Sequence, residues 1–324
     1  MGALGKIARL CAHSTLFPAM RAEGDPLIGG QAVMEGVMMR TPQSYCVAVR
    51  KPSGDITTLE DSSVRLSDRS RFWAVPLVRG CGVLGQSMAL GVKALNFSAS
   101  QAADGADEEP EELPGWMLGV NIAISVGFFI VMYKLVPLLA TSQLEGLLPV
   151  LGTPVAFSAV EGVVRIGIFL AFLLAIARMK DIRRVFEYHG AEHKVVHNHE
   201  SGQGLSVANA QRFTTLHPRC GTSFLMFVML VAIAVYAFVP VENMVGSFLA
   251  RIALLPLIAG ASFEIIRYTA KRQGSVFSLV AQPGLWLQRI TTRQPDDSQV
   301  EVAIHALERA FDFERRAGGS AVIA

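Results

Sequence analysis

Residues 116–140 read WMLGVNIAISVGFFIVMYKLVPLLA, an apolar run that contains a single charged residue, Lys134. A helix needs about 20 consecutive apolar residues to cross a hydrocarbon core of about 30 Å. Three further apolar stretches follow, at residues 154–177, 224–241 and 244–266. The chain is therefore predicted to be a mainly α, polytopic helical membrane protein with about four transmembrane helices.

The composition supports this class. Of 324 residues, 51% are hydrophobic and only 17% are charged, which is too apolar for an ordinary soluble domain of this length. The alternative, core helices of a large soluble protein, fits the lengths of the runs less well. The net charge of +2 gives no continuous basic face, so no nucleic-acid partner is expected. The cysteines form no CxxC pair, which suits a reducing compartment; they are Cys11, Cys46, Cys81 and Cys220.

Flanking charges predict the orientation. Lys and Arg concentrate after the second span and after the fourth, whereas the loops after spans one and three have none. Cytoplasmic loops carry an excess of positive residues. We expect a multipass protein of a bacterial inner membrane, with both termini and the central loop cytoplasmic and no cleavable signal peptide. The residues concerned are Arg178, Lys180, Arg183, Arg184, Arg267, Lys271 and Arg272.

Five segments follow from these patterns. Residues 1–26 form an N-terminal tail, and 27–100 combine a cytoplasmic β-hairpin with a glycine-containing amphipathic helix. Residues 101–115 hold the acidic stretch DGADEEPEE and read as a linker. Residues 116–266 form the four-span domain, with a histidine-rich cytoplasmic loop at 178–223. Residues 267–324 contain two cytoplasmic or interfacial amphipathic helices.

The candidate chemistry lies in EYHGAEHKVVHNH at residues 187–199. In a helix, His189, His193 and His197 follow one another at four-residue spacing, so adjacent pairs share a face and can meet one metal ion. His189, Glu192 and His193 also match the H-x-x-E-H pattern, in which a glutamate handles the proton of a metal-bound water. The alternative is a polar helix beside the membrane whose histidines only titrate.

A second cluster, HPRCGTS at residues 217–223, returns to the same membrane face just before the third span. His217 and Cys220 would complete a tetrahedral site with two of the upstream histidines, because imidazole and thiolate are ordinary zinc donors. The alternative is a turn that starts a helix. Glu187 and Arg219, inside the two motifs, are further candidates.

Two other groups of polar residues remain open to interpretation. GGQAVMEGVMMR at residues 29–40 matches no nucleotide-binding motif, so its glycines either permit a tight bend or present Glu35 and Arg40 toward the central loop. Glu161 and Arg165 lie one turn apart in the second span, which is compatible with a transport path or with a paired, structural role.

Together, IGGQAVMEGVMMR (28–40), EYHGAEHK (187–194) and HPRCGTSF (217–224) resemble motifs of the YqhQ-like family (DUF1385) of bacterial membrane proteins. The resemblance runs from about residue 27 to 293. The resemblance implies a multipass inner-membrane protein. It also implies dependence on a metal, an assignment that rests on the same histidines.

Three functions follow as hypotheses. The preferred one is a metal-dependent hydrolase acting on a peptide or lipid-linked substrate at the cytoplasmic face of the bilayer. His189, His193 and either His217 or Cys220 would hold a divalent metal, zinc being expected, and Glu192 would be the general base. The rivals are a non-catalytic membrane scaffold or assembly factor that binds a protein partner, and a transporter. The sequence does not fix the oligomeric state.

Overall fold

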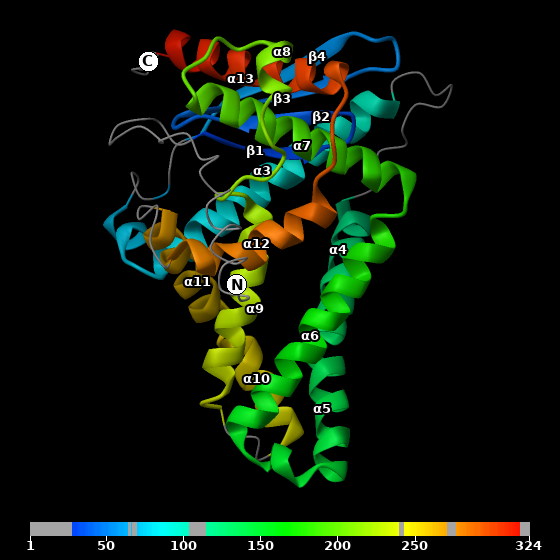
Figure 1. Ribbon diagram of the computed structural model, residues 1–324, viewed down its shortest axis with the longest axis vertical. Coiled ribbons are helices and arrows are strands. Elements are labelled where there is room, and N and C mark those ends of the chain that lie inside the picture. Colours follow the sequence, from blue (N-terminus) through cyan, green and yellow to red (C-terminus); the bar gives the residue numbers. More distant parts are fainter. Residues whose placement is uncertain are drawn as a thin grey trace, which may run out of the picture.

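The computed structural model describes residues 28–63, 66, 70–103, 115–239, 243–270 and 277–317. The expected tail at 1–26 and most of the acidic linker lie outside these residues. The described chain is mainly helical with one small antiparallel sheet, so the mainly α class and the N-terminal β element are confirmed. The sheet and its covering helices lie at one end, and the long apolar helices at the other (Figure 1).

The sheet is a four-stranded antiparallel meander in the order β1-β2-β3-β4. Its strands are β1 (Gly29–Val33), β2 (Gly36–Arg40), β3 (Ser44–Arg50) and β4 (Ile56–Ser62). A two-residue turn joins β1 to β2, and Glu35 in it has a φ of 52°, a region that non-glycine residues seldom adopt. Gly36 follows, where a Cβ would lie 2.1 Å from the Ala48 carbonyl oxygen. The close approach of β2 and β3 therefore requires glycine at position 36.

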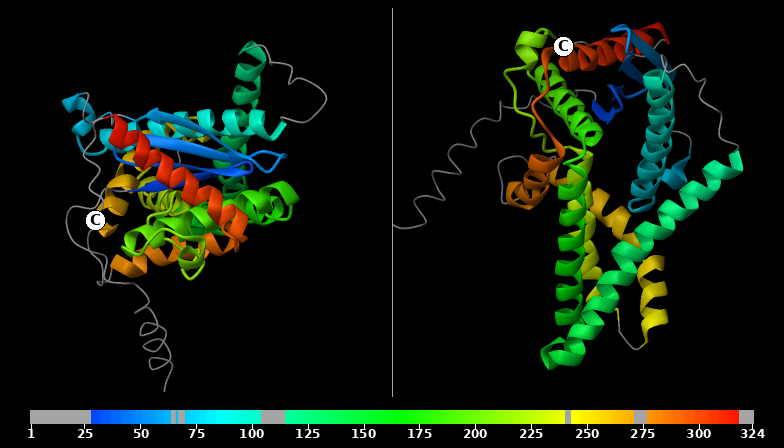
Figure 2. Two further views of the ribbon diagram at one scale, coloured as in Figure 1. Left: turned by 90° about the horizontal axis from the view of Figure 1, so that it is seen from above. Right: turned by 90° about the vertical axis from the view of Figure 1, so that its right-hand side faces the viewer.

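Both faces of the sheet are covered, because alternate residues of a strand point to opposite sides. Val37 and Met39 pack against α7 (Lys180–Glu200) and α13 (Asp297–Arg316). Met38 and Val47 pack against the opposite helix, α3 (Val78–Ala103). Figure 2 shows the sheet between α13 and α3.

Helix α13 packs into this core. It begins with a capping box in which the Asp296 carboxylate accepts the Gln299 N–H at 2.9 Å and the Gln299 side chain accepts the Asp296 N–H at 3.0 Å. On its apolar stripe, Val300 and Leu307 are fully buried against the sheet and α7, and Ile304 is partly buried. The C-terminal helix thus holds α7 on the sheet.

The apolar half of the molecule contains two helices long and apolar enough to cross a membrane, Gly119–Leu147 and Pro154–Ile176. The first is made of α4 (Gly115–Ile130), a π-helical turn η3 (Val131–Leu135) and α5 (Val136–Leu147). The second is α6. Exposed apolar side chains such as Ile124 and Val163 cover their outer faces, which is the surface that lipid would contact.

The other two expected spans are not shown as single long helices. Helix α9 (Gly221–Tyr236) is apolar but only 16 residues long. Helices α10 (Met244–Ala253) and α11 (Leu255–Ala270) meet at a 42° bend and would make a third span if the pair is taken as one. By length and composition, the described residues therefore hold two spans, or up to three.

The remaining elements are short or lie at the junction of the two halves. Helix α12 (Phe277–Thr291) contacts α9 near the sheet end of the bundle and carries Pro283 inside it. The short elements are η2 (Arg71–Ala74), η4 (Pro149–Gly152) and α8 (Val207–Ala210).

The apolar half encloses a network of charged side chains. Glu161 forms a buried ion pair with Arg165 on its own helix and another with Arg251 of α10, whose Nη2 lies 2.8 Å from Glu161 Oε2. Lys134 of the π-helical turn donates to the Tyr236 hydroxyl at 2.6 Å. Glu161 and Arg165 therefore face the bundle interior as a pair, as expected for charges among apolar helices.

Candidate functional site

One face of α7 carries a row of possible metal ligands. His189, His193 and His197 are spaced by four residues, and Glu200 continues the row one turn later. The ring centroids of His189 and His193 are 4.5 Å apart. The sheet and the segments that follow α8 and α12 pack around α7, so His193 is buried and the other three residues of the row are partly buried.

Two histidines and one cysteine converge at the start of α9. The donor atoms of His189, His193 and Cys220 all lie within 4.8 Å of one another. Cys220 is the N-cap residue of α9, and its Sγ accepts the backbone N–H of Thr222 at 3.4 Å. Because the N-terminus of a helix stabilises negative charge, this position suits a thiolate ligand. His189 Nε2 lies 3.2 Å from the sulfur.

Both histidine rings are oriented by backbone carbonyls. His189 Nδ1 donates to the Thr291 oxygen at 2.8 Å, and His193 Nδ1 donates to the Thr215 oxygen at 2.5 Å. A ring that donates from Nδ1 keeps the Nε2 lone pair for a ligand, and metal-binding histidines are usually held in this way. His193 Nε2 is buried and makes no hydrogen bond among the described residues. The donor set and this unpaired atom fit a divalent metal.

Close packing fixes the positions of α7, the chain after α12 and the loop before α9 relative to one another. A Cβ at Gly190 would lie 1.9 Å from the Arg293 carbonyl oxygen, so glycine lets the chain after α12 approach α7. The side chain of Gln288 on α12 accepts the His217 N–H and donates to the His217 carbonyl, both at 2.7 Å. These two hydrogen bonds fix the position of the loop that contains His217 and Cys220.

His217, by contrast, is not arranged as a fourth ligand. It groups with His197 and Glu200, whose donor atoms lie within 4.8 Å of one another. Its Nδ1 accepts the backbone N–H of Arg219 at 3.3 Å, so a neutral ring carries its proton on Nε2. Burial lowers the pKa of His217 to about 3, with a smaller contribution from His193. The ring is neutral at pH 7.

The other members of this second group are also engaged. His197 Nε2 donates to the Leu216 carbonyl at 3.0 Å. Burial, followed by the charge of His217, lowers the pKa of His197 to about 4. Glu200 forms an ion pair with Arg219. The structure thus separates the five expected ligands into two groups, His189, His193 and Cys220 in one, and His197 and His217 beside Glu200 in the other.

Glu192 lies on a neighbouring face of α7, buried against β1. A Cβ at Gly30 would lie 2.6 Å from Glu192 Cγ, which explains glycine at this point of the strand. Burial raises the pKa of Glu192 to about 7, opposed by His189 and by the Gly30 backbone N–H. Its Oε2 is 3.4 Å from His193 Nε2. A carboxylate with a pKa near neutral pH therefore stands beside the first donor group.

The remaining candidates lie elsewhere. Glu35 forms an ion pair with Arg184 on α7, Nη2 to Oε2 at 2.6 Å, which ties the β1–β2 turn to the histidine helix. Arg40 on β2 donates to Gln86 of α3 at 3.4 Å. Glu187 lies 3.5 Å from the exposed Arg183 and accepts from Gln299 at the start of α13. None of the three belongs to a donor group among the described residues.

Sequence patterns alone did not identify Glu200, Gln288 or the carbonyls of Thr215 and Thr291. Glu200 had a usable signal, since it lies three residues beyond His197 and so on the same face of the helix. Gln288 and the two carbonyls had none, because they meet α7 only through tertiary packing.

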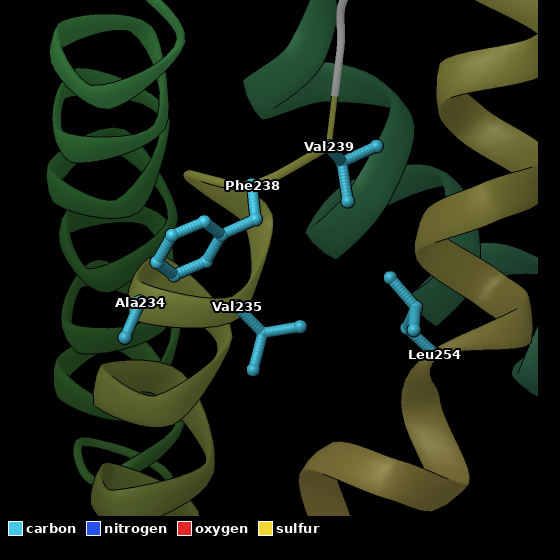
Figure 3. Close-up of a pocket in the computed structure, with 5 residues that line it drawn as sticks. All are labelled: Ala234, Val235, Phe238, Val239 and Leu254. Carbon is cyan, nitrogen blue, oxygen red and sulfur yellow. The ribbon is translucent and has the colours of Figure 1, made fainter.

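An apolar recess lies away from this site, on the bundle between α9 and the bend of α10 and α11. Figure 3 shows the side chains that line it; they are Ala234, Val235, Phe238, Val239 and Leu254. It carries no polar side chain, so it offers no catalytic or metal-ligating group.

Comparisons place the chain in a family. The model of a family described as protein of unknown function (DUF1385) matches residues 75–313. The chain is also 32% identical, over 300 residues, to the uncharacterized protein YqhQ of Bacillus subtilis (strain 168), an alignment that covers 89% of this chain and 93% of the relative. No solved structure matches. With three quarters of its length inside the family model and a relative aligned over most of both chains, the protein belongs to the DUF1385 family.

Proposed function

We propose that this protein is a metal-dependent membrane enzyme whose metal, zinc in the first instance, is held by His189, His193 and Cys220. The observation that carries the proposal is the convergence of these three donors within 4.8 Å, with both rings oriented by backbone carbonyls. Catalytic zinc sites commonly use three protein ligands and leave a fourth position for water or substrate. Three converging donors match the protein part of that pattern.

The proposed placement is a four-span bundle in a bacterial inner membrane. Helix α9 would be a short third span, and the bent α10–α11 pair the fourth. The α5–α6 turn, the last residues of α9 and the first residues of α10 lie at the end of the bundle away from the sheet (Figure 1), and Lys and Arg flank the end that carries α7. By the positive-inside rule the sheet, the histidine helix and the site would face the cytoplasm.

The proposed reaction is hydrolysis of a peptide or lipid-linked substrate. Bound zinc lowers the pKa of a water molecule toward 7 and polarises a carbonyl or phosphoryl oxygen. Glu192 would act as the general base, because its pKa of about 7 lets it accept a proton near neutral pH and release it afterwards. The carbonyls of Thr215 and Thr291 hold the imidazoles still, and the apolar helices alongside would bring the site level with the lipid headgroups.

The test is metal content. The full chain is purified in detergent without a histidine tag and analysed for metals, beside a variant with His189 and His193 both changed to Ala. We expect about one zinc per chain, lost in the double variant. His305→Ala on α13 is the matched control, since this histidine belongs to neither donor group, and it should keep its metal. Glu192→Gln should also keep it while losing turnover.

The outcomes separate the hypotheses. Absence of metal from the wild type would sink the enzyme mechanism and favour a non-catalytic scaffold. Loss of metal from E192Q would move Glu192 into the ligand set and remove the assigned base.

A further inference from the structure

Buried polar atoms without hydrogen bonds gather beside the proposed metal site. Among the described residues, eight buried side-chain nitrogen or oxygen atoms have no hydrogen-bond partner, and four of them belong to His193, Glu200, His217 and Arg219. Buried polar groups are almost always paired, and each exception asks for an explanation. His193 is explained by the proposed metal. The other three belong to neighbouring side chains, because Glu200 contacts both His217 and Arg219, and they need a different explanation.

Two of those three atoms are hydrogen-bond donors. His217 Nε2 carries the ring proton because its Nδ1 accepts the Arg219 N–H. Arg219 Nε is always protonated. Both side chains are mostly buried, His217 at 6% exposure and Arg219 at 25%. Two converging donors, one of them charged, are arranged for an anionic oxygen acceptor and not for a cation.

Glu200 is the acceptor that occupies this position, and its fit is poor. Its Oε2 lies 3.5 Å from His217 Nε2, beyond a good hydrogen bond. Its other oxygen is paired with Arg219 through Nη2, which leaves Arg219 Nε without a hydrogen-bond partner among the described residues. His217 Nε2 and Arg219 Nε are therefore both left without a hydrogen bond although a carboxylate lies beside them.

We propose that His217 and Arg219 bind a phosphoryl group of the substrate, which displaces Glu200 from Arg219. The proposal rests on the proposed function, because it names the substrate class of the same site. The rings of His217 and His193 are 5.6 Å apart, so a phosphoryl group here would lie next to the metal donors. The N-terminus of α9 also favours an anion, since Arg219 and Cys220 lead directly into that 16-residue helix.

Inorganic phosphate binding to the full chain in detergent, measured calorimetrically, tests this. Glu200→Gln removes the competing charge and should bind phosphate at least tenfold more tightly than wild type. Arg219→Gln in the E200Q background should lose at least tenfold of that affinity. Arg183→Gln is the matched control: an exposed arginine on α7, whose loss should leave phosphate binding unchanged. If R219Q fails to fold, Arg219→Lys keeps the charge but not the planar fork, and should still weaken binding.

A second experiment distinguishes a lipid headgroup from a soluble compound as the source of the phosphoryl group. Nanodiscs of phosphatidylcholine with or without phosphatidylglycerol supply the lipid source. Competition between the anionic lipid and inorganic phosphate for E200Q would assign a headgroup, and its absence a soluble phosphoryl compound. Either result supports the site.

Metal content measured on the same samples keeps the two proposals apart. Two outcomes would overturn the phosphoryl site even when one zinc per chain is present. In the first, millimolar phosphate does not bind to E200Q. In the second, phosphate binds equally well to E200Q and to the double variant with R219Q. Phosphate binding without metal instead removes the hydrolytic mechanism.

Discussion

Replacing Glu161 by Gln tests whether water is excluded from the charge network inside the bundle, as the burial of its side chains indicates. The side chains of Glu161, Arg165 and Arg251 are 1%, 5% and 0% exposed. Removing one partner of a buried ion pair costs about 3–5 kcal/mol, because the other charge stays buried and unpaired. Gln keeps an acceptor oxygen, and Arg165 keeps the Tyr133 carbonyl at 3.0 Å. We therefore expect the lower end, about 3 kcal/mol, which is roughly a 150-fold change in the unfolding equilibrium constant.

Arg183 supplies the control, because its pair with Glu187 has the same four-residue spacing but 62% exposure at Arg183. R183Q should cost less than about 1 kcal/mol. Both variants and the wild type would be unfolded by sodium dodecyl sulfate in mixed micelles, followed by far-ultraviolet circular dichroism, and their free energies of unfolding compared. Equal, small losses for E161Q and R183Q would refute the reasoning, because they would mean that water solvates Glu161 and its partners.

Three further predictions concern the site. Burial raises the pKa of Glu192 from 4.5 to about 7, so the folded metal-free protein holds this proton more tightly than the unfolded chain. The stability of wild type relative to E192Q should therefore fall by roughly 3 kcal/mol as pH rises from 4.5 to about 7; a difference independent of pH contradicts the burial of this carboxyl. In a chain that retains only Cys46 and Cys220, a maleimide at pH 8 should modify Cys220 and spare Cys46, whose pKa burial raises to about 12. Added zinc should protect Cys220, and equal labelling of both thiols would argue against the packing of β3. Gly190→Ala places a methyl group against a backbone oxygen and should cost about 1–3 kcal/mol and weaken zinc binding, whereas Gly204→Ala, with open space around its Cβ, should change neither.

Helical periodicity accounts for the part of the site that the sequence predicted. His189 and His193 share a face because four residues make about one turn, and that inference needs only the local sequence. Cys220 followed from a second motif at the same end of the bundle. The local pattern could not distinguish Cys220 from His217 as the third donor, because the choice depends on which ring nitrogen the Arg219 backbone N–H occupies.

The fold shows the same division. Residues 116–140 and 154–177 carry enough apolar length to predict α4 to α6 directly. The 42° bend between α10 and α11 gives no break in apolar length, and its local signal is Pro256, which lies in the first turn of α11 and lacks the backbone N–H of a helix interior. Local sequence predicts a β-hairpin within residues 27–100, but covering of both sheet faces by α3, α7 and α13 arises only when segments far apart in sequence pack together.

The docking of α13 on α7 has a consequence for the order of events during synthesis. The helix that carries the histidines packs against residues 297–316, which begin 97 positions after that helix ends. A ribosome finishes the whole bundle before it releases that last helix, so α7 can pack against α13 only after the rest of the chain has been made. The zinc centre we propose would then assemble only on finished chains. A truncated chain would contain the histidines but would not hold them in the arrangement that binds zinc.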